Sequence, residues 1–408
     1  MNNNESKLKR IIERDLQYYA FSQNLSTVVP LFPEHIHIEP TNSCNLRCVH
    51  CHQSSPGTHF TKARGMMDFD VYKKIIDEIK GKSEQITLDS QGEPTTHPKI
   101  MEMVEYAKEA GLGVNLLTNG LKLSEEYTER LLAVKLDRVV FSFEGSTEEL
   151  HERIRRRSDF HLTLRNILYF MKRNCETGKN TFVCMSMIRH RYTVEDEQPY
   201  KDYFNSVPSD TIFVSPLQTM SGSSPLSDER AVHTQKKHSG ERGRICRTAF
   251  FNMSIGWDGG VCACPLDYNE AHPVGNVTRE DLTDVYNSDR MQKFRQCHLD
   301  GDYTWIEEQG ELCSSCNILY DPDYTEYDMT LLGTYLVNHI MRVSKVLMAD
   351  EEEEKKYNPA DDAKYQKCVS ELARVDEQIA SGETGQIAKS AKSLRSKQLR
   401  ETAISGDW

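Results

Sequence analysis

Long apolar runs, an excess of basic residues and an apolar leader are all missing from this 408-residue sequence. No uninterrupted apolar stretch approaches the roughly 20 residues that a membrane-spanning helix needs. The opening residues, MNNNESKLKRIIERDLQYY, contain no apolar segment of the kind found in signal peptides. The formal net charge is −12, whereas phosphate binding requires clustered Lys and Arg. We therefore expect a cytoplasmic protein with no membrane and no nucleic acid among its main partners.

Cysteine, by contrast, is abundant. The chain has 12 cysteines, placed too irregularly for a small disulfide scaffold. In a reducing compartment, clustered cysteines usually bind metal or take part in catalysis. With 38% hydrophobic residues the chain can bury a core, and its length suits a barrel with an appended module. We find no internal repeat.

The first half of the chain alternates between short apolar runs and longer amphipathic stretches. Six runs have the length and composition of strands, at 35–39, 85–89, 113–117, 138–142, 181–187 and 211–216. Between them, 68–81 has an apolar stripe at helical spacing, and 99–111 ends in Gly111, a plausible helix C-cap. A strand followed by a helix, six times over, predicts a parallel sheet with helices outside. The expected fold class is α/β, a partial (β/α)6 barrel with reactive groups at the carboxyl ends of its strands.

The remainder of the chain differs in composition. Residues 217–242 are polar and rich in Gly and Ser, whereas 243–320 contain six further cysteines and a hairpin-like segment, FNMSIGWDGGVCAC. Residues 328–356 are amphipathic, and the charged residues after them offer little to form a core. We expect an N-terminal helical segment, a barrel, a loop or linker, a small cysteine-bearing domain and a helical acidic extension, at 1–34, 35–216, 217–242, 243–323 and 324–408.

Three cysteines, Cys44, Cys48 and Cys51, follow the first expected strand with the spacing C-x3-C-x2-C. A tetrahedral site needs four protein ligands, and this loop offers three cysteines. A cubane iron–sulfur cluster has four irons, so three thiolates leave one iron open to another ligand. The alternative is a zinc knuckle with His50 or His52 as its fourth ligand.

The cysteine motif after a first strand resembles the signature of the radical S-adenosylmethionine (SAM) superfamily. The resemblance implies a [4Fe–4S] cluster whose open iron binds the amino and carboxylate groups of SAM. One electron from that cluster then cleaves SAM to methionine and a 5′-deoxyadenosyl radical. The implied electron source is a donor such as flavodoxin or ferredoxin.

Four further segments resemble motifs of the same superfamily, in order and each after an expected strand. In SQGEPTTHP (90–98), the resemblance implies that Gly92 permits close backbone approach and that Glu93 accepts from the SAM ammonium. LLTNG (116–120) adds Asn119 to the SAM site, and FSFEG (141–145) makes Ser142 and Glu144 candidates for its ribose and amino group. In HERIRRRSDF (151–160), Arg155 is suited to pair with a carboxylate. Gln91 and Arg156 stand where the family usually has glycine.

A second set of cysteines consists of Cys246, Cys264, Cys313 and Cys316. The first two are spaced C-x12-G-x4-C with Gly259 in a tight WDGG turn, and the last two are spaced C-x2-C. Four thiolates are a complete ligand set for a [4Fe–4S] cluster. The pattern resembles the SPASM/twitch module, in its shortened twitch form with one auxiliary cluster, because no further cysteine follows nearby. A four-cysteine zinc ribbon is the alternative.

The resemblance implies that the radical removes a hydrogen atom from a carbinol C–H of a small sugar or aminocyclitol-like substrate. The product is then a ketone, or an inverted alcohol if a thiol returns a hydrogen atom. Alternation along 181–187 puts Cys184 on the more polar face, which suits the barrel lumen and a hydrogen donor, although a buried packing role is the alternative. Two other functions stay open: modification of a ribosomal peptide and a non-enzymatic zinc scaffold. Peptide-modifying relatives commonly have an N-terminal winged-helix domain, for which the residues before 35 are too few.

Overall fold

The computed structural model describes residues 23–33, 35–54, 60–218, 245–246, 248–310 and 357–383, with isolated residues among 9–21 and 312–319. The helix expected over 328–356 and nearly all of the loop at 217–242 lie outside the described residues. Of the described helices, none combines the length and the apolar character that crossing a membrane requires.

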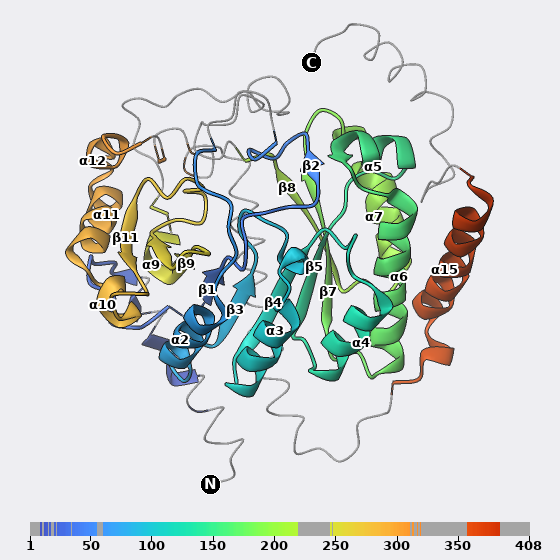
Figure 1. The fold of residues 1–408 in the computed structure, drawn as a ribbon, viewed down its shortest axis with the longest axis horizontal. Helices are drawn as coiled ribbons and strands as arrows, with labels where there is room; N and C mark the ends of the chain where they lie inside the picture. Colours follow the sequence, from blue (N-terminus) through green and yellow to red (C-terminus); the bar gives the residue numbers. More distant parts are fainter. Residues whose placement is uncertain are drawn as a thin grey trace, which may run out of the picture.

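One mixed sheet organises the described part of the chain (Figure 1). Its strand order is β11-β10-β9-β1-β3-β4-β5-β7-β8. The bounds are β1 His35–Ile38, β3 Gln85–Leu88, β4 Gly113–Thr118, β5 Arg138–Ser142, β7 Phe182–Arg189, β8 Thr211–Pro216, β9 Asn252–Ile255, β10 Gly260–Cys262 and β11 Pro273–Asn276. The six strands from β1 to β8 are parallel, which confirms the α/β prediction.

The cysteine-bearing region of the second half extends this same sheet. β9 pairs in parallel with β1, placing His35 opposite Asn252, and β10 and β11 continue antiparallel beyond it. A separate two-residue ladder joins β2 (Arg47–Cys48) to β6 (Arg155–Arg156). The two expected cluster regions are therefore connected by backbone hydrogen bonds and not only by a linker.

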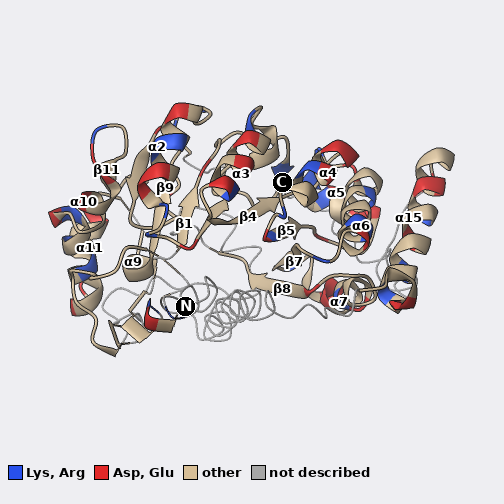
Figure 2. Cartoon of the chain, turned by 90° about the horizontal axis from the view of Figure 1, so that it is seen from below, with Lys and Arg blue, Asp and Glu red and all other residues tan. Residues whose placement is uncertain are grey.

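Helices cover one face of the sheet (Figure 2). Their bounds are α2 Phe69–Ile79, α3 Ile100–Glu109, α4 Glu125–Ala133, α5 Glu148–Ile154, α6 Phe160–Glu176, α7 Glu197–Asn205, α9 Thr248–Phe251, α10 Leu282–Tyr286, α11 Asp289–Asp300, α12 Thr304–Glu307 and α15 Ala363–Ser381. Short 3-10 turns lie at η1 Pro94–Thr96, η2 Val194–Asp196 and η3 Pro359–Asp361. α2 begins where the Asp68 side chain accepts from the Asp70 N–H, as an N-cap does.

Alternation along the parallel strands separates an apolar face from a polar one. Ile36 and Ile38 of β1 are fully buried in the main core beneath the helices. His35 and His37 therefore point to the opposite, concave face. On β7, Val183, Met185 and Met187 are likewise core residues, so Cys184 lies on the concave face.

Helix α15 corrects one expectation. Residues beyond 356 were expected to have little to form a core, but Cys368 and Val375 of α15 are fully buried. The Cys368 thiol donates to the Leu168 carbonyl at 3.3 Å, and Arg165 pairs with Asp376 at 2.7 Å. α15 therefore packs along α6 as part of the fold (Figure 1).

Candidate functional site

The first three cysteines lie together on the loop after β1. Cys48 belongs to β2 and is buried, whereas Cys44 and Cys51 are half-buried. The pKa of the Cys44 thiol is raised to about 11, chiefly by burial and in smaller part by the charges of Glu93 and Cys51. A bound metal centre would supply the positive charge that keeps such thiols ionised.

The donor set suits a cluster with one open position. Every cysteine is described, and none is in a disulfide. Within the described residues, no three His, Cys, Asp or Glu side chains are placed to hold a single metal ion. Cubane ligands bind different iron atoms, so they lie farther apart than the ligands of one ion. The Leu46 N–H donates to the Cys44 sulfur at 3.4 Å, a contact that tunes iron–sulfur centres.

Gly92 and Glu93 hold the loop after β3 against the cysteine loop. A Cβ on Gly92 would lie 2.1 Å from the Thr41 carbonyl oxygen and 2.7 Å from that of Ser43. The Glu93 N–H donates to the same Ser43 oxygen at 2.9 Å. The close backbone approach expected at Gly92 is therefore made by the cysteine loop of this chain, at Thr41 and Ser43.

The Glu93 carboxylate connects the ends of two strands. Its Oε1 accepts from Thr95 N–H at 3.1 Å, Thr95 Oγ1 at 2.6 Å and Thr118 Oγ1 at 2.7 Å. Its Oε2 accepts from the Asn119 N–H at 2.7 Å, and the Asn119 side-chain amide donates to Asn45 at 2.9 Å. Any contact of Glu93 with a SAM ammonium would be made in addition to these bonds.

Glu144 and Arg155 form a buried ion pair beside Cys48. Arg155 Nε donates to Glu144 Oε2, and its Nη1 lies 3.9 Å from the Cys48 sulfur. Burial lowers the pKa of Arg155, but the charge and hydrogen bond of Glu144 together with the charges of Cys48 and Cys44 outweigh it and raise the pKa above its ordinary value. Glu144 Oε1 is buried and has no hydrogen-bond partner among the described residues. An ammonium group would satisfy this oxygen. Ser142, the last residue of β5, is half-buried and precedes Glu144 by two positions.

The two histidines of the motif pack against other rings. Burial lowers the pKa of His50 to about 3, and its ring lies 5.8 Å from that of His190. Burial also lowers the pKa of His52, to about 4, and its ring lies 4.4 Å from that of Tyr268. Tyr268 follows Cys264 closely in sequence, so this ring contact joins the two cysteine regions.

The second cysteine set is also brought together. Burial raises the pKa of Cys313 well above its ordinary value, and Cys316, Cys264 and Cys246 all lie near enough to raise it further. The Leu266 N–H donates to the Cys264 sulfur at 3.4 Å, which repeats the contact at Cys44. Gly259, with φ of 82°, makes the turn before β10.

Cys262 and Cys297, which belong to neither set, are each 4% exposed. A buried packing role suits both thiols.

His298 is a neighbour of this set that the sequence did not single out. Its Nε2 lies 3.7 Å from the Cys313 sulfur. Its ring is 2% exposed and packs between Phe294, at 5.2 Å, and Tyr303, at 5.1 Å. His298 belongs to no sequence motif, so nothing near it in the sequence indicated this contact.

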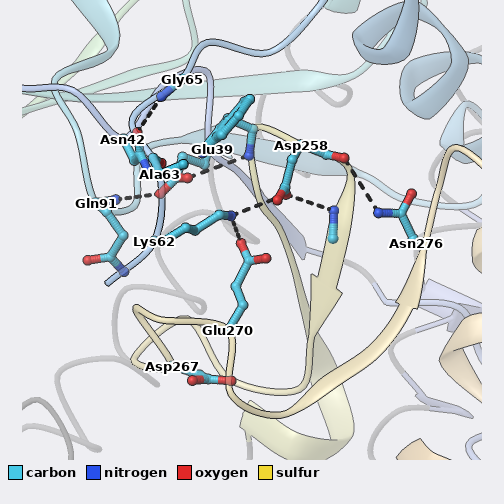
Figure 3. Close-up of polar contacts among 12 residues, drawn as sticks. Glu39, Asn42, Lys62, Ala63, Gly65, Gln91, Asp258, Asp267, Glu270 and Asn276 are labelled. Carbon is cyan, nitrogen blue, oxygen red and sulfur yellow. Dashed lines mark hydrogen bonds and ion pairs between the residues drawn. The ribbon is translucent and has the colours of Figure 1, made fainter. Parts of the chain in front are cut away.

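A polar network ties the cysteine loop to the β9–β10 hairpin (Figure 3). Lys62 hydrogen bonds to Glu270 and lies 3.1 Å from Asp258. Glu39, at the end of β1, accepts from the Gln91 N–H at 3.0 Å and from the Trp257 N–H at 3.5 Å. Burial raises the pKa of Glu270 to about 7, although Lys62 acts in the other direction.

Asn42 secures the same loop. Its amide donates to the Ala63 carbonyl at 2.7 Å and accepts from the Gly65 N–H at 2.9 Å (Figure 3). Together with the Lys62 network, these bonds hold the two cysteine regions in a fixed relation.

The concave face carries a histidine–aspartate pair. His37 Nδ1 lies 2.9 Å from Asp89 Oδ2, and the two side chains are 18% and 14% exposed. Burial lowers the pKa of His37, but the charge and hydrogen bond of Asp89 outweigh it and raise the pKa. The His35 ring centroid lies 4.6 Å from that of His37, with the two rings tilted, and its Nε2 contacts Thr87 Oγ1 at 2.6 Å. The alternating HIHI of β1 was the available signal for this pair.

Cys184 lies on the same face but is only 1% exposed. Its sulfur donates to the Met185 carbonyl at 3.7 Å, and its strand neighbours are Val140 and Thr211. Burial raises the pKa of this thiol, while Arg138 lowers it.

Comparisons with known proteins agree with this arrangement. Residues 38–196 match the model of the radical SAM superfamily, and residues 246–317 match SPASM, an iron–sulfur cluster-binding domain. An AdoMet-dependent heme synthase of Methanosarcina barkeri is 37% identical over 30% of this chain and 34% of its own length. The mycofactocin maturase MftC of Mycobacterium tuberculosis is 35% identical over 31% of this chain and 32% of its own. The matches thus span about a third of these relatives.

Among solved structures, SuiB of Streptococcus suis bound to precursor peptide SuiA aligns with a TM-score of 0.51 and 16% identity. The alignment covers 69% of this chain and 70% of that one. At this level of identity, the likeness concerns the fold.

Proposed function

This chain belongs to the radical SAM superfamily and carries a SPASM iron–sulfur domain, and from that premise we propose that its reaction begins with reductive cleavage of SAM. The ligands proposed for the SAM-binding [4Fe–4S] cluster are Cys44, Cys48 and Cys51. Those proposed for the auxiliary [4Fe–4S] cluster are Cys246, Cys264, Cys313 and Cys316. When bound, these groups supply a 5′-deoxyadenosyl radical and a one-electron acceptor.

The observation that carries this proposal is the unpartnered Oε1 of Glu144 beside Arg155 and Cys48. Glu144 would accept from the SAM amino group, and Arg155 would pair with a carboxylate. Ser142 is proposed for the SAM ribose and Asn119 for the same site. Glu93 positions the loop through its bonds to Thr95, Thr118 and Asn119, with one lone pair of Oε2 left for the ammonium.

The substrate reaction we propose is oxidation of a carbinol C–H. The substrate gives a hydrogen atom to the 5′-deoxyadenosyl radical, its hydroxyl proton to His37 Nε2 and one electron to the acceptor, which leaves a ketone. Asp89 holds the ring through Nδ1, and Nε2 is the nitrogen that would take the proton. A small polyhydroxylated substrate suits a concave face with this pair, Thr87 and Asn115.

Inversion of the alcohol is the less supported outcome. It requires Cys184 to return a hydrogen atom, and this thiol is 1% exposed with its hydrogen directed at the Met185 carbonyl. In heavy water, inversion through Cys184 would place deuterium at the reacting carbon, whereas oxidation would release a ketone.

Modification of a ribosomal peptide is the second candidate. Similarity to a mycofactocin maturase favours it. In that case the same lumen would take a peptide side chain, and the hydrogen atom would come from that side chain.

The test begins with the clusters. Replacing Cys44, Cys48 and Cys51 with Ala should abolish 5′-deoxyadenosine formation and leave about four irons, one cubane's worth. Cys175→Ala, a buried barrel cysteine outside both sets, is the matched control and should keep both clusters. Continued 5′-deoxyadenosine formation would refute the first ligand set, and a triple variant without iron would refute the second.

The substrate class is tested with the intact enzyme. A panel of sugars, aminocyclitols and short ribosomal precursor peptides is incubated with SAM and reductant, and 5′-deoxyadenosine is measured against a substrate-free control. Stimulation by peptides alone would replace oxidation of a small carbinol with peptide modification.

A further inference from the structure

Positive charge is concentrated beside the first cysteine loop of an otherwise acidic chain, whose net charge is −12. Figure 2 shows Lys and Arg segments at α5 and its neighbouring helices, beside acidic segments such as the first turn of α5. Four arginines here are exposed and one, Arg153, is half-buried. We call these five the arginine patch: Arg47, Arg153, Arg156, Arg157 and Arg191.

The β2–β6 ladder places two of these charges directly opposite each other. Arg47 pairs with Arg156, and the next pair is Cys48 with Arg155. Like charges in directly opposed positions of an antiparallel ladder are destabilising. The fold therefore keeps two exposed guanidinium groups next to Cys48 at some cost in stability.

Arg157 is held in a conformation that favours glycine. The Ser158 N–H donates to the Arg155 carbonyl at 2.9 Å, which closes a turn, and Arg157 at its third position has φ of 70°. Among the described residues Arg157 has no ion-pair partner. The nearby carboxylates of Glu152 and Asp159 accept from backbone N–H groups at the start of α6.

A small apolar cluster fixes the rest of the patch. Val49, which follows Cys48, packs with Leu150 and Ile154 of α5, and Tyr192 covers them. The guanidinium groups of Arg153 and Arg191 lie 4.6 Å and 5.0 Å from the Tyr192 ring centroid. The patch thus forms an ordered surface around the segment that carries Cys48.

We propose that the arginine patch is the docking surface for an acidic one-electron donor protein of the flavodoxin or ferredoxin kind. The proposal rests on the first cluster of the proposed function, which must gain one electron while the donor loses one. A small anion is normally held by convergent, buried donors, whereas these arginines spread over an exposed surface. An acidic partner is repelled by most of this chain, so a local basic patch directs it to the strand that bears Cys48.

The test compares a protein donor with a small one. The variant Arg156→Glu/Arg157→Glu should weaken flavodoxin binding to the intact enzyme at least tenfold at low salt, measured by calorimetry without SAM. Formation of 5′-deoxyadenosine should fall comparably with reduced flavodoxin and stay unchanged with dithionite. The matched control, Arg279→Glu/Lys293→Glu, makes the same charge change at exposed positions elsewhere and should alter neither measurement.

Three results would overturn the proposal. The first is an unchanged affinity for flavodoxin in the patch variant. The second is an equal loss of flavodoxin affinity in the control variant. The third is loss of substrate-stimulated turnover with dithionite at unchanged flavodoxin binding, which would assign the patch to an acidic substrate. If the double variant is unstable, Arg157→Gly removes one charge at a position that favours glycine, and should still weaken flavodoxin binding. Failure of the wild type to cleave SAM with dithionite would instead refute the proposed function.

Discussion

Replacing Glu93 with Gln tests whether this carboxylate ties the strand ends together. The carboxylate accepts from Thr95 and Thr118 through one oxygen and from Asn119 through the other. Glutamine has one oxygen, so in either orientation its NH2 group faces a backbone N–H. An unsatisfied buried group costs about 1–3 kcal/mol, and loss of charge from the remaining bonds adds about 1 kcal/mol. The free energy of unfolding should therefore fall by about 2–4 kcal/mol.

The assay is thermal unfolding of the intact protein, followed with an affinity measurement for SAM. For a domain of this size each kcal/mol shifts the melting temperature by about 2–4 °C, so Glu93→Gln should lower it by roughly 4–16 °C. Thr118→Val is the milder comparison, because it keeps the carboxylate and removes one hydroxyl, which donates to Glu93 and accepts from the Gly120 N–H at 3.1 Å. It should cost about 1–2 kcal/mol.

A specific result would refute this reasoning. If Glu93→Gln melts within about 1 °C of the wild type while its affinity for SAM falls about tenfold, Glu93 serves SAM and not the loop. Comparable losses of stability and of SAM affinity would agree with a role of Glu93 in connecting the strand ends, since the loop positions the SAM site.

Three further predictions follow from the site. Gly92→Ala places a Cβ 2.1 Å from the Thr41 carbonyl, so the cysteine loop must move, and iron analysis should show loss of about four irons with the auxiliary cluster kept; full iron content would contradict this. Because Asp89 raises the pKa of His37, turnover should increase as pH rises through a midpoint above 6.5, and Asp89→Asn should lower that midpoint. An unchanged midpoint would remove His37 as the proton acceptor. His298→Leu removes the neighbour of the Cys313 sulfur at 3.7 Å, and should lower the reduction potential of the auxiliary cluster, measured by spectroscopic titration, without loss of iron. Phe294→Leu, which disturbs only the packing of the ring, is the control.

Much of the parallel sheet could be predicted because buried parallel strands are short, dense apolar runs between helices. All six expected strands are present, with bounds that differ by one or two residues at most. Gly111 marked a helix end because caps depend on local backbone conformation: it follows α3 with φ of 84°. Both cysteine sets were visible because the cysteines within each motif lie at fixed spacings, C-x3-C-x2-C in the first set and C-x12-G-x4-C and C-x2-C in the second.

Contacts between distant segments were not predictable in this way. The pairing of β1 with β9, the network of Lys62 with Glu270 and the packing of α15 on α6 each join residues about 200 positions apart. No local periodicity encodes such a pair. The residues after 356 were expected to contribute little to a core because they are mostly charged, yet Cys368 and Val375 of α15 are fully buried.

The sequence by itself determined the class of chemistry. The cysteine spacings, and the strand that precedes each motif, are local patterns that can be recognised along the chain. The tertiary structure decided what each side chain contacts: Glu93 binds the ends of its own strands, Glu144 keeps one oxygen unpartnered, and Cys184 is buried. It also placed Arg47 against Arg156 beside Cys48. These outcomes depend on the distances between elements that meet only in the folded chain, because hydrogen bonding and burial are set by packing and not by the order of residues along the chain.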